Sequence, residues 1–179
     1  PLRHNSVETF DEYNTKRNVG TGTPTVWWDI VPHWDGCEIY TYMAGGGCTL
    51  PGRAMVLMPG AGYEGVTDFV LDQMTSYGLN ACPPLLVGVG VGTSIETAAL
   101  QSKKALMRPL DVRNPDPYYA SLEGELLEKI NALGIGPQGF GGLSTALGLN
   151  IEVLPTHIAG MPCAVNIGCH ATRHKTEVL

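Results

Sequence analysis

Two cysteines lie where this sequence would fix a thiol at the end of a buried strand. Cys82 stands between the end of an apolar helical pattern and the apolar run 85–91, and two prolines follow it. Those prolines lack the backbone N–H and the φ freedom that would let the cysteine join either element. Cys169 follows a second short apolar run, 164–167. Thiols fixed in this way are typical of metal ligands, so we expect Cys82 and Cys169 to meet at one metal cluster.

The composition favours a globular protein kept in a reducing compartment. At 179 residues, 44% hydrophobic and 16% charged, the chain can bury an ordinary core, and we expect one domain over residues 1–179. It has no run of 18 apolar residues and no signal-peptide pattern, so neither a membrane span nor export is indicated. The five cysteines favour thiols kept for metal binding over disulfides, which predicts a cytoplasmic protein. A net charge of −6 without a Lys/Arg run counts against nucleic acid as a partner.

The elements that must position these cysteines are short. Runs rich in β-branched and aromatic residues predict strands at 23–31, 38–43, 54–58, 85–91, 147–154 and 163–167. Apolar residues at helical spacing predict helices over 66–77, after 93–96 and over 118–133. Long βαβ alternation is not evident, so we predict an α+β fold with short mixed or antiparallel strands in one or two small sheets and about three packed amphipathic helices.

Two of the helices carry local signals. The Thr-x-x-Glu spacing of Thr93 and Glu96 is that of a capping box, which would begin the second helix. In the third helix the apolar residues share one side, and its charged residues are expected to face water. Those charged residues are Glu123, Glu125, Glu128 and Lys129.

Glycine-rich segments at 44–52 and 134–142 predict loops dominated by main chain. Glycine turns can offer backbone N–H groups to an anion because no side chain covers them. Gly88, Gly90 and Gly92 only weakly match a nucleotide-binding loop and lack the P-loop lysine, so we interpret them as close packing of a strand.

Several separated runs together resemble the α-type region of the iron–sulfur hydro-lyases, the class I fumarase and L-tartrate dehydratase family. They follow the family's order along nearly the whole sequence. The runs are Ala-Gly-Gly-Gly at 44–47, Asn-Ala-Cys-Pro-Pro at 80–84, Val-Gly-Val-Gly at 87–90, Gly-Ile-Gly-Pro-Gln-Gly at 134–139, Pro-Thr-His-Ile-Ala at 155–159 and Gly-Cys-His-Ala at 168–171.

The resemblance implies a four-iron, four-sulfur (4Fe-4S) cluster with three cysteine ligands and one iron open to substrate. Cys82 and Cys169 stand at two of the family's ligand positions. The third ligand belongs to an upstream Cys-Gln-Asp-Thr-Gly segment that does not occur here. We therefore expect these residues to be part of a longer α-type chain, and a cluster with two thiolates to be easily lost. Cys48 is the alternative third ligand.

The resemblance also implies a substrate site. Gly46 matches the family's substrate-binding glycine loop, and Thr49 and Arg53 follow where that loop lines the pocket. His157 matches a substrate-contacting histidine, taken here as catalytic. Arg3 matches an arginine that pairs with a substrate carboxylate, a pairing that orients as well as binds.

The expected function is the α-type part of a hydro-lyase that hydrates and dehydrates a C4 dicarboxylate. Fumarate and malate are favoured by Arg-Asn-Pro-Asp-Pro at 113–117 and Thr-His-Ile-Ala at 156–159, whereas the loop 47–52 is similar to L(+)-tartrate dehydratases. The remaining catalytic residues of the family lie in its β-type region, which is absent here. The resemblance therefore implies a β-type partner chain or domain, a homo- or hetero-oligomer, and little activity of this chain alone.

Other interpretations stay open at this point. The chain could be a cluster-free structural or regulatory domain of the same fold, or a nucleotide-binding module. Cys37 and Cys163 lie at strand edges and are expected to be structural, and His170 and His174 are expected to be solvated.

Overall fold

The structure, a computed structural model, describes residues 24–179. The chain divides into two compact units, Pro1–Cys37 and Glu38–Leu179, and the single domain expected over residues 1–179 stays a prediction. The strand expected at 23–31 is wrong for residues 24–31, which have no regular structure. Trp28 and Ile30 are 84% and 94% exposed there. The β-forming side chains of this segment have no neighbouring strand to pair with among the described residues, and β-propensity acts through such neighbours.

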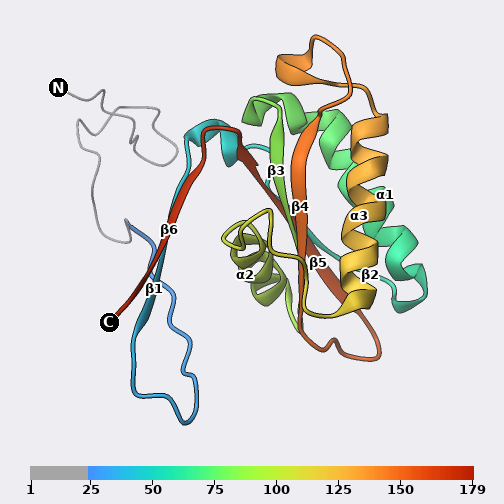
Figure 1. Ribbon diagram of the computed structural model, residues 1–179. Coiled ribbons are helices and arrows are strands. Elements are labelled where there is room, and N and C mark those ends of the chain that lie inside the picture. Colours follow the sequence, from blue (N-terminus) through green and yellow to red (C-terminus); the bar gives the residue numbers. More distant parts are fainter. Residues whose placement is uncertain (1–23) are drawn as a thin grey trace, which may run out of the picture. The chain divides into compact units, whose positions relative to one another are not determined.

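The larger unit is built on a four-stranded mixed sheet with the order β2-β5-β3-β4 (Figure 1). β3 pairs with β4 in parallel and with β5 antiparallel, and β2 pairs with β5 antiparallel. The sheet thus confirms the expected mixed arrangement of short strands. The strands are β2 (Arg53–Leu57), β3 (Leu85–Val91), β4 (Ala146–Val153) and β5 (Met161–Cys169).

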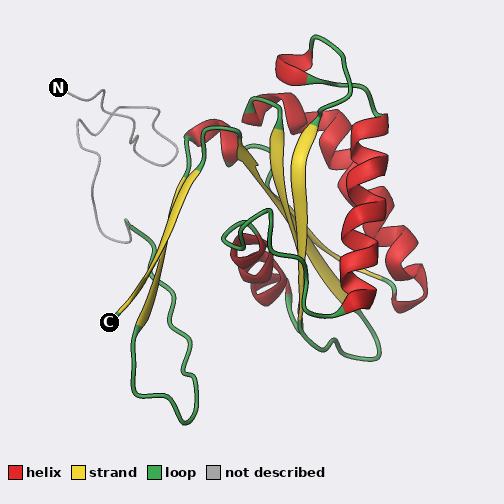
Figure 2. Cartoon of the chain, in the orientation of Figure 1, coloured by secondary structure: helices red, strands yellow, loops and turns green. Residues whose placement is uncertain are grey.

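Three helices cover the two faces of this sheet, as Figure 2 shows, so the α+β prediction is confirmed. α1 (Gly62–Tyr77) and α3 (Pro117–Ala132) lie on one face, and α2 (Ile95–Ala105) lies on the other (Figure 1). The core fills the space between the sheet and the helices α1 and α3, because the apolar faces of these helices are buried only there. Its central side chains are Val70, Met74, Val87, Val89, Leu126, Ile130, Val165 and Ile167.

α2 lies unusually close to β3. A Cβ on Gly90 would stand 2.1 Å from the carbonyl oxygen of Ala98, and one on Gly88 would stand 2.2 Å from that of Ser102. Real Cβ atoms do not approach backbone this closely, so only glycine lets the helix reach the strand. The interpretation of these glycines as close packing is confirmed.

The start of α2 differs from the predicted one. The cap is Ser94, whose side chain accepts from the Thr97 N–H, while the Ser94 N–H donates to the Thr97 hydroxyl at 2.8 Å. The predicted capping box of Thr93 and Glu96 is wrong, because the observed box lies one residue later, at Ser94 and Thr97. The hydroxyl of Thr93 instead donates to the carbonyl oxygen of Pro155, 3.0 Å away, and so ties α2 to the loop after β4.

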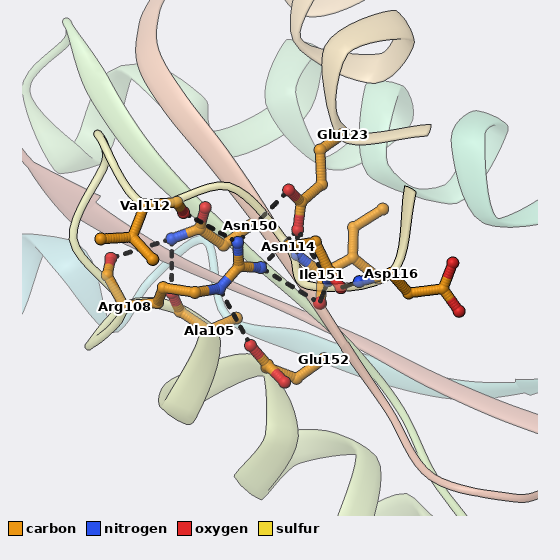
Figure 3. Close-up of polar contacts among 9 residues, drawn as sticks. All are labelled: Ala105, Arg108, Val112, Asn114, Asp116, Glu123, Asn150, Ile151 and Glu152. Atoms are coloured by element: carbon orange, nitrogen blue, oxygen red, sulfur yellow. Dashed lines mark hydrogen bonds and ion pairs between the residues drawn. The ribbon is translucent and has the colours of Figure 1, made fainter. Parts of the chain in front are cut away.

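The prediction that all charged residues of α3 face water is wrong for Glu123. This residue is buried and forms an ion pair with Arg108, which also reaches Glu152 at 3.1 Å (Figure 3). The Glu123 carboxylate accepts the backbone N–H of Ile151 at 2.7 Å as well. A buried charge must be paired. The partner cation, Arg108, comes from the segment after α2, so the residue pattern of α3 alone could not predict that Glu123 is buried. The network fixes that segment against β4.

A second, two-stranded sheet pairs the two ends of the larger unit. β1 (Glu38–Met43) runs antiparallel to β6 (Arg173–Val178), with Met43 opposite Arg173. β6 was not expected from the sequence, because its exposed polar side chains show no apolar alternation. No helix within residues 24–179 has the length and apolar character needed to cross a bilayer.

Candidate functional site

Cys82 occupies a constrained turn between α1 and β3. The 3₁₀ turn η3 (Gly78–Ala81) follows α1, and the Cys82 N–H donates to the Leu79 carbonyl at 3.1 Å. Its φ of 59° and ψ of 78° lie in the left-handed region, which is costly for a residue with a Cβ. The side chain is exposed. Strain of this kind often marks a functional position, and here the strained residue carries an exposed thiol.

Cys169 reaches the same end of the sheet. It is the last residue of β5 and lies opposite Leu85, the first residue of β3, three positions after Cys82. The carbonyl oxygen of Cys82 can only accept, so the ring Nδ1–H of His170 donates to it, at 3.2 Å. The structure therefore brings the two cysteine-bearing segments together as expected. That both thiols are ligands stays a prediction, and His170, expected to be solvated, is exposed but ties the two segments together.

The surroundings of Cys169 stabilise a thiolate. Its Sγ accepts the N–H of Ala171 at 3.3 Å and the hydroxyl of Thr172 at 3.9 Å. Burial by itself raises the pKa of this thiol, but these donors and the Cys48 side chain outweigh it, so the pKa is lowered. A metal-binding cysteine must be deprotonated, and this environment favours that form.

Cys48 comes close to Cys169 from a different part of the chain. It ends the 3₁₀ turn η1 (Gly46–Cys48), is only 3% exposed, and its thiol lies close enough to Cys169 for each thiol to shift the pKa of the other. Burial raises the pKa of the Cys48 thiol. The turn packs tightly on η3, since a Cβ on Gly47 would lie 2.5 Å from the Asn80 carbonyl oxygen. Three thiol-bearing segments thus converge at one end of the sheet.

Tyr42 and Lys103 complete this region and were not predicted. Burial raises the pKa of Tyr42 to about 12, and the Lys103 ammonium lies 5.2 Å from the centre of the tyrosine ring. Burial lowers the pKa of Lys103, while the nearby Cys48 raises it. A cation beside clustered thiols would favour an anionic group here. No sequence signal could have found these residues, because each lies on a different element.

The second glycine loop supports the Cys82 turn. Gln138, within the 3₁₀ turn η4 (Pro137–Gly139), donates its backbone N–H and its side-chain amide to the carbonyl oxygen of Pro83, at 3.0 and 2.9 Å. Its φ is 54°, so this residue also adopts the left-handed region. The loop serves as a brace behind the cysteine, a role that glycine content alone did not predict.

The expected substrate-binding residues of the first glycine loop have different surroundings. A Cβ on Gly46 would meet nothing within 4 Å, so its main chain is uncovered, and the Thr49 N–H donates to the Gly46 carbonyl at 3.0 Å. Arg53 instead contacts α1: it pairs with Asp72 at 2.8 Å and lies over the ring of Phe69. Their contact with substrate stays a prediction. Arg3 lies outside the described residues.

His157 lies at the opposite end of the sheet from the cysteines. It belongs to the loop between β4 and β5, and its Nδ1 accepts the Ala159 N–H at 3.0 Å. It lines a surface cavity of about 470 Å³ together with residues 93–96 at the start of α2. The whole of β5 (Met161–Cys169) separates its loop from Cys169, and eight steps of about 3.3 Å make that strand roughly 26 Å long. The structure does not bring His157 to the thiols.

The remaining cysteines behave differently from these three. Cys163 is fully buried, and burial raises its pKa to about 11, which agrees with a structural role. Cys37 is exposed. Within residues 24–179, no three or more His, Cys, Asp or Glu side chains are arranged to hold a single metal ion.

The chain is similar to known proteins over nearly its whole length. The chain is 56% identical over 176 residues to the L(+)-tartrate dehydratase subunit alpha of Escherichia coli strain UTI89 and 55% identical to that of strain K12. It is 40% identical over 174 residues to a putative L(+)-tartrate dehydratase subunit alpha of Methanocaldococcus jannaschii. These matches cover 97–98% of this chain but only 58–61% of the relatives, so the chain spans about three fifths of their length.

The family model described as fumarate hydratase (Fumerase) matches residues 1–178. The resemblance carried by the separated glycine, cysteine and histidine runs is confirmed by both comparisons. This chain belongs to the fumarate hydratase (Fumerase) family.

Proposed function

We propose that this chain is the α-type part of an iron–sulfur hydro-lyase that adds water to, or removes it from, a C4 dicarboxylate. The observation that carries the proposal is the convergence of Cys82 and Cys169 at one sheet end, where β3 and β5 pair and His170 joins the two segments. Family membership supports the reaction class.

The donor chemistry at this end of the sheet fits an iron–sulfur cluster. Cys82 presents an exposed thiol, and main-chain and hydroxyl donors stabilise the Cys169 thiolate, as cluster ligands require. Cys82 and Cys169 would hold the cluster, and the third thiolate would come from a Cys-Gln-Asp-Thr-Gly segment outside these 179 residues. When bound, a cluster with an open iron supplies a Lewis acid for a substrate hydroxyl and carboxylate.

The chain's own residues would bind and orient the substrate. The uncovered main chain at Gly46 offers N–H groups to a carboxylate, and Lys103 adds a positive charge nearby. Arg3, Thr49 and Arg53 are proposed as further substrate contacts. His157 is proposed as catalytic, but a four-carbon substrate at the thiols is too short to reach it within one chain, so that role requires a second chain.

The two candidate substrates rest on different observations. The relatives at 55–56% identity are named for L(+)-tartrate, and the loop 47–52 is similar to theirs, which favours tartrate. The matching family description names fumarate hydratase, which favours fumarate and malate. Because the relatives are named as alpha subunits, we propose a β-type partner in a hetero-oligomer, in the cytoplasm where thiols stay reduced.

The test combines the longer α-type chain with a β-type partner. Both are purified without oxygen, supplied with iron and sulfide, and given tartrate or malate. The oxaloacetate formed from tartrate and the fumarate formed from malate are measured. Activity on at least one substrate that is lost in Cys82→Ser and Cys169→Ser, but kept in Cys163→Ser, is expected. Full activity of either ligand variant, or turnover of neither substrate, would refute the proposal.

A further inference from the structure

Two strand ladders bracket the segments that carry Cys48 and Cys169. Cys48 lies five residues after Met43 and five before Arg53. Met43 pairs with Arg173, and Arg53 pairs with Val165, and these two partners lie four residues on either side of Cys169. Two separate strand ladders therefore bracket the two cysteines, so their proximity does not depend on one mobile side chain.

The two sulfurs differ in exposure. Cys48 is 3% exposed and belongs to the core, whereas Cys169 is only partly buried. Among the described residues, Cys48 is the thiol whose side chain interacts with that of Cys169. A small oxidant can therefore reach Cys169 from solvent, whereas burial protects Cys48 from direct oxidation.

We propose that Cys48 and Cys169 form a reversible disulfide when the chain meets peroxide. The Cys169 sulfur attacks one peroxide oxygen, the O–O bond breaks, and hydroxide leaves, giving a sulfenic acid at Cys169. The Cys48 sulfur then attacks the Cys169 sulfur, and the sulfenic oxygen leaves as water with the thiol proton. Overall, two thiols are oxidised to one disulfide and one peroxide is reduced to two waters.

The disulfide has two consequences. It stops Cys169 from passing to the sulfinic acid, which thiols do not reverse. It also takes Cys169 away from metal, a consequence that rests on the proposed function, whereas the disulfide itself does not. Cys48 is thus assigned as a resolving thiol that preserves Cys169.

The test uses the metal-free chain, reduced under nitrogen and then treated with hydrogen peroxide. We expect a mass lower by two hydrogen atoms and one main cross-linked peptide pair, Cys48 with Cys169, after digestion without reductant. In Cys48→Ser we expect Cys169 to gain two oxygen atoms and to resist dithiothreitol, whereas wild type and Cys163→Ser recover fully. Cys82 is exposed, so equal oxidation of Cys82 in the three proteins shows that they received the same peroxide dose.

Other outcomes overturn the proposal. These are a main cross-link from Cys169 to Cys82, or sulfinic acid at Cys169 forming as fast in wild type as in Cys48→Ser. If circular dichroism shows that Cys48→Ser does not fold, the identity of the main cross-link in the wild-type chain tests the proposal by itself. In chain first loaded with iron and sulfide, the disulfide should appear only as the cluster absorbance falls. If the reduced chain takes up no iron while the cross-link forms, the proposed function fails and this inference stands.

Discussion

Gln138 binds the carbonyl oxygen of Pro83 with both its backbone N–H and its side-chain amide, at 3.0 and 2.9 Å. The residue that it braces follows Cys82 directly, so the orientation of the exposed thiol depends on a loop more than fifty positions later in the chain. The site is therefore supported by contacts that no single stretch of sequence contains.

Replacing Gln138 with Asn should loosen the Cys82 turn. Asn tolerates the left-handed backbone at this position, but it is one methylene too short to keep the amide bond to Pro83. The free energy of unfolding should fall by about 1 kcal/mol, and Cys82 should alkylate faster than in wild type. Leu143→Ala, at a residue 90% exposed, is the control. Unchanged alkylation of Cys82 would show that the brace has no role.

Replacing Glu123 with Gln should strongly destabilise the protein. Arg108 would keep Glu152 but lose its buried partner, and losing one partner of a buried pair costs about 3–5 kcal/mol. We expect a loss near the lower end, measured by urea unfolding. Glu125→Gln on the same helix, at an exposed residue, should change stability by less than about 0.5 kcal/mol. Equal effects of the two variants would contradict the buried network.

Two glycine replacements should act in opposite directions. Gly90→Ala would press a methyl group against Ala98 and Ser102 of α2, at 2.1 and 2.3 Å from backbone atoms, and should cost about 1–3 kcal/mol or more. Gly124→Ala meets nothing within 4 Å in α3 and should stabilise by about 0.5–1 kcal/mol. Thermal unfolding measures both. A neutral Gly90→Ala would mean that α2 can move away from the strand freely.

Cysteine alkylation should distinguish the exposed thiols from the buried Cys163. At pH 8, Cys37 and Cys82 are exposed and should react first. Cys163 is buried with a pKa of about 11, so it should stay protonated and unmodified until the protein unfolds. Peptide mapping after timed alkylation gives the order. Early labelling of Cys163 in folded protein would overturn its structural assignment.

Local patterns predicted the elements whose contacts are apolar. The strand at 85–91 and the helical face of Leu126 and Ile130 were correct because burial of such residues sets their periodicity. The patterns failed where a partner decides the outcome. Residues 24–31 have β-forming side chains but no paired strand, and Glu123 is buried only because Arg108 meets it.

The candidate site shows the same division. Each cysteine could be placed at a strand end from its neighbours, but that Cys48 touches Cys169 follows from two ladders joining distant segments. The position of His157 depends on strand direction: β5 runs from its loop toward Cys169, so the histidine and the thiol lie at opposite ends. Family resemblance singled out these residues as candidates without giving their arrangement.

The pairing of β1 with β6 joins Glu38 to Val178, nearly the whole length of the larger unit apart. Closing so long a loop is slow, because chain entropy must be lost before the contact forms. β6 comes after every other element of the larger unit in chain order, so the β1–β6 ladder beside Cys48 and Cys169 can close only after those elements have been made. Assembly of the larger unit is therefore ordered in time: its helices and central strands can fold before the ladder beside the thiol end closes.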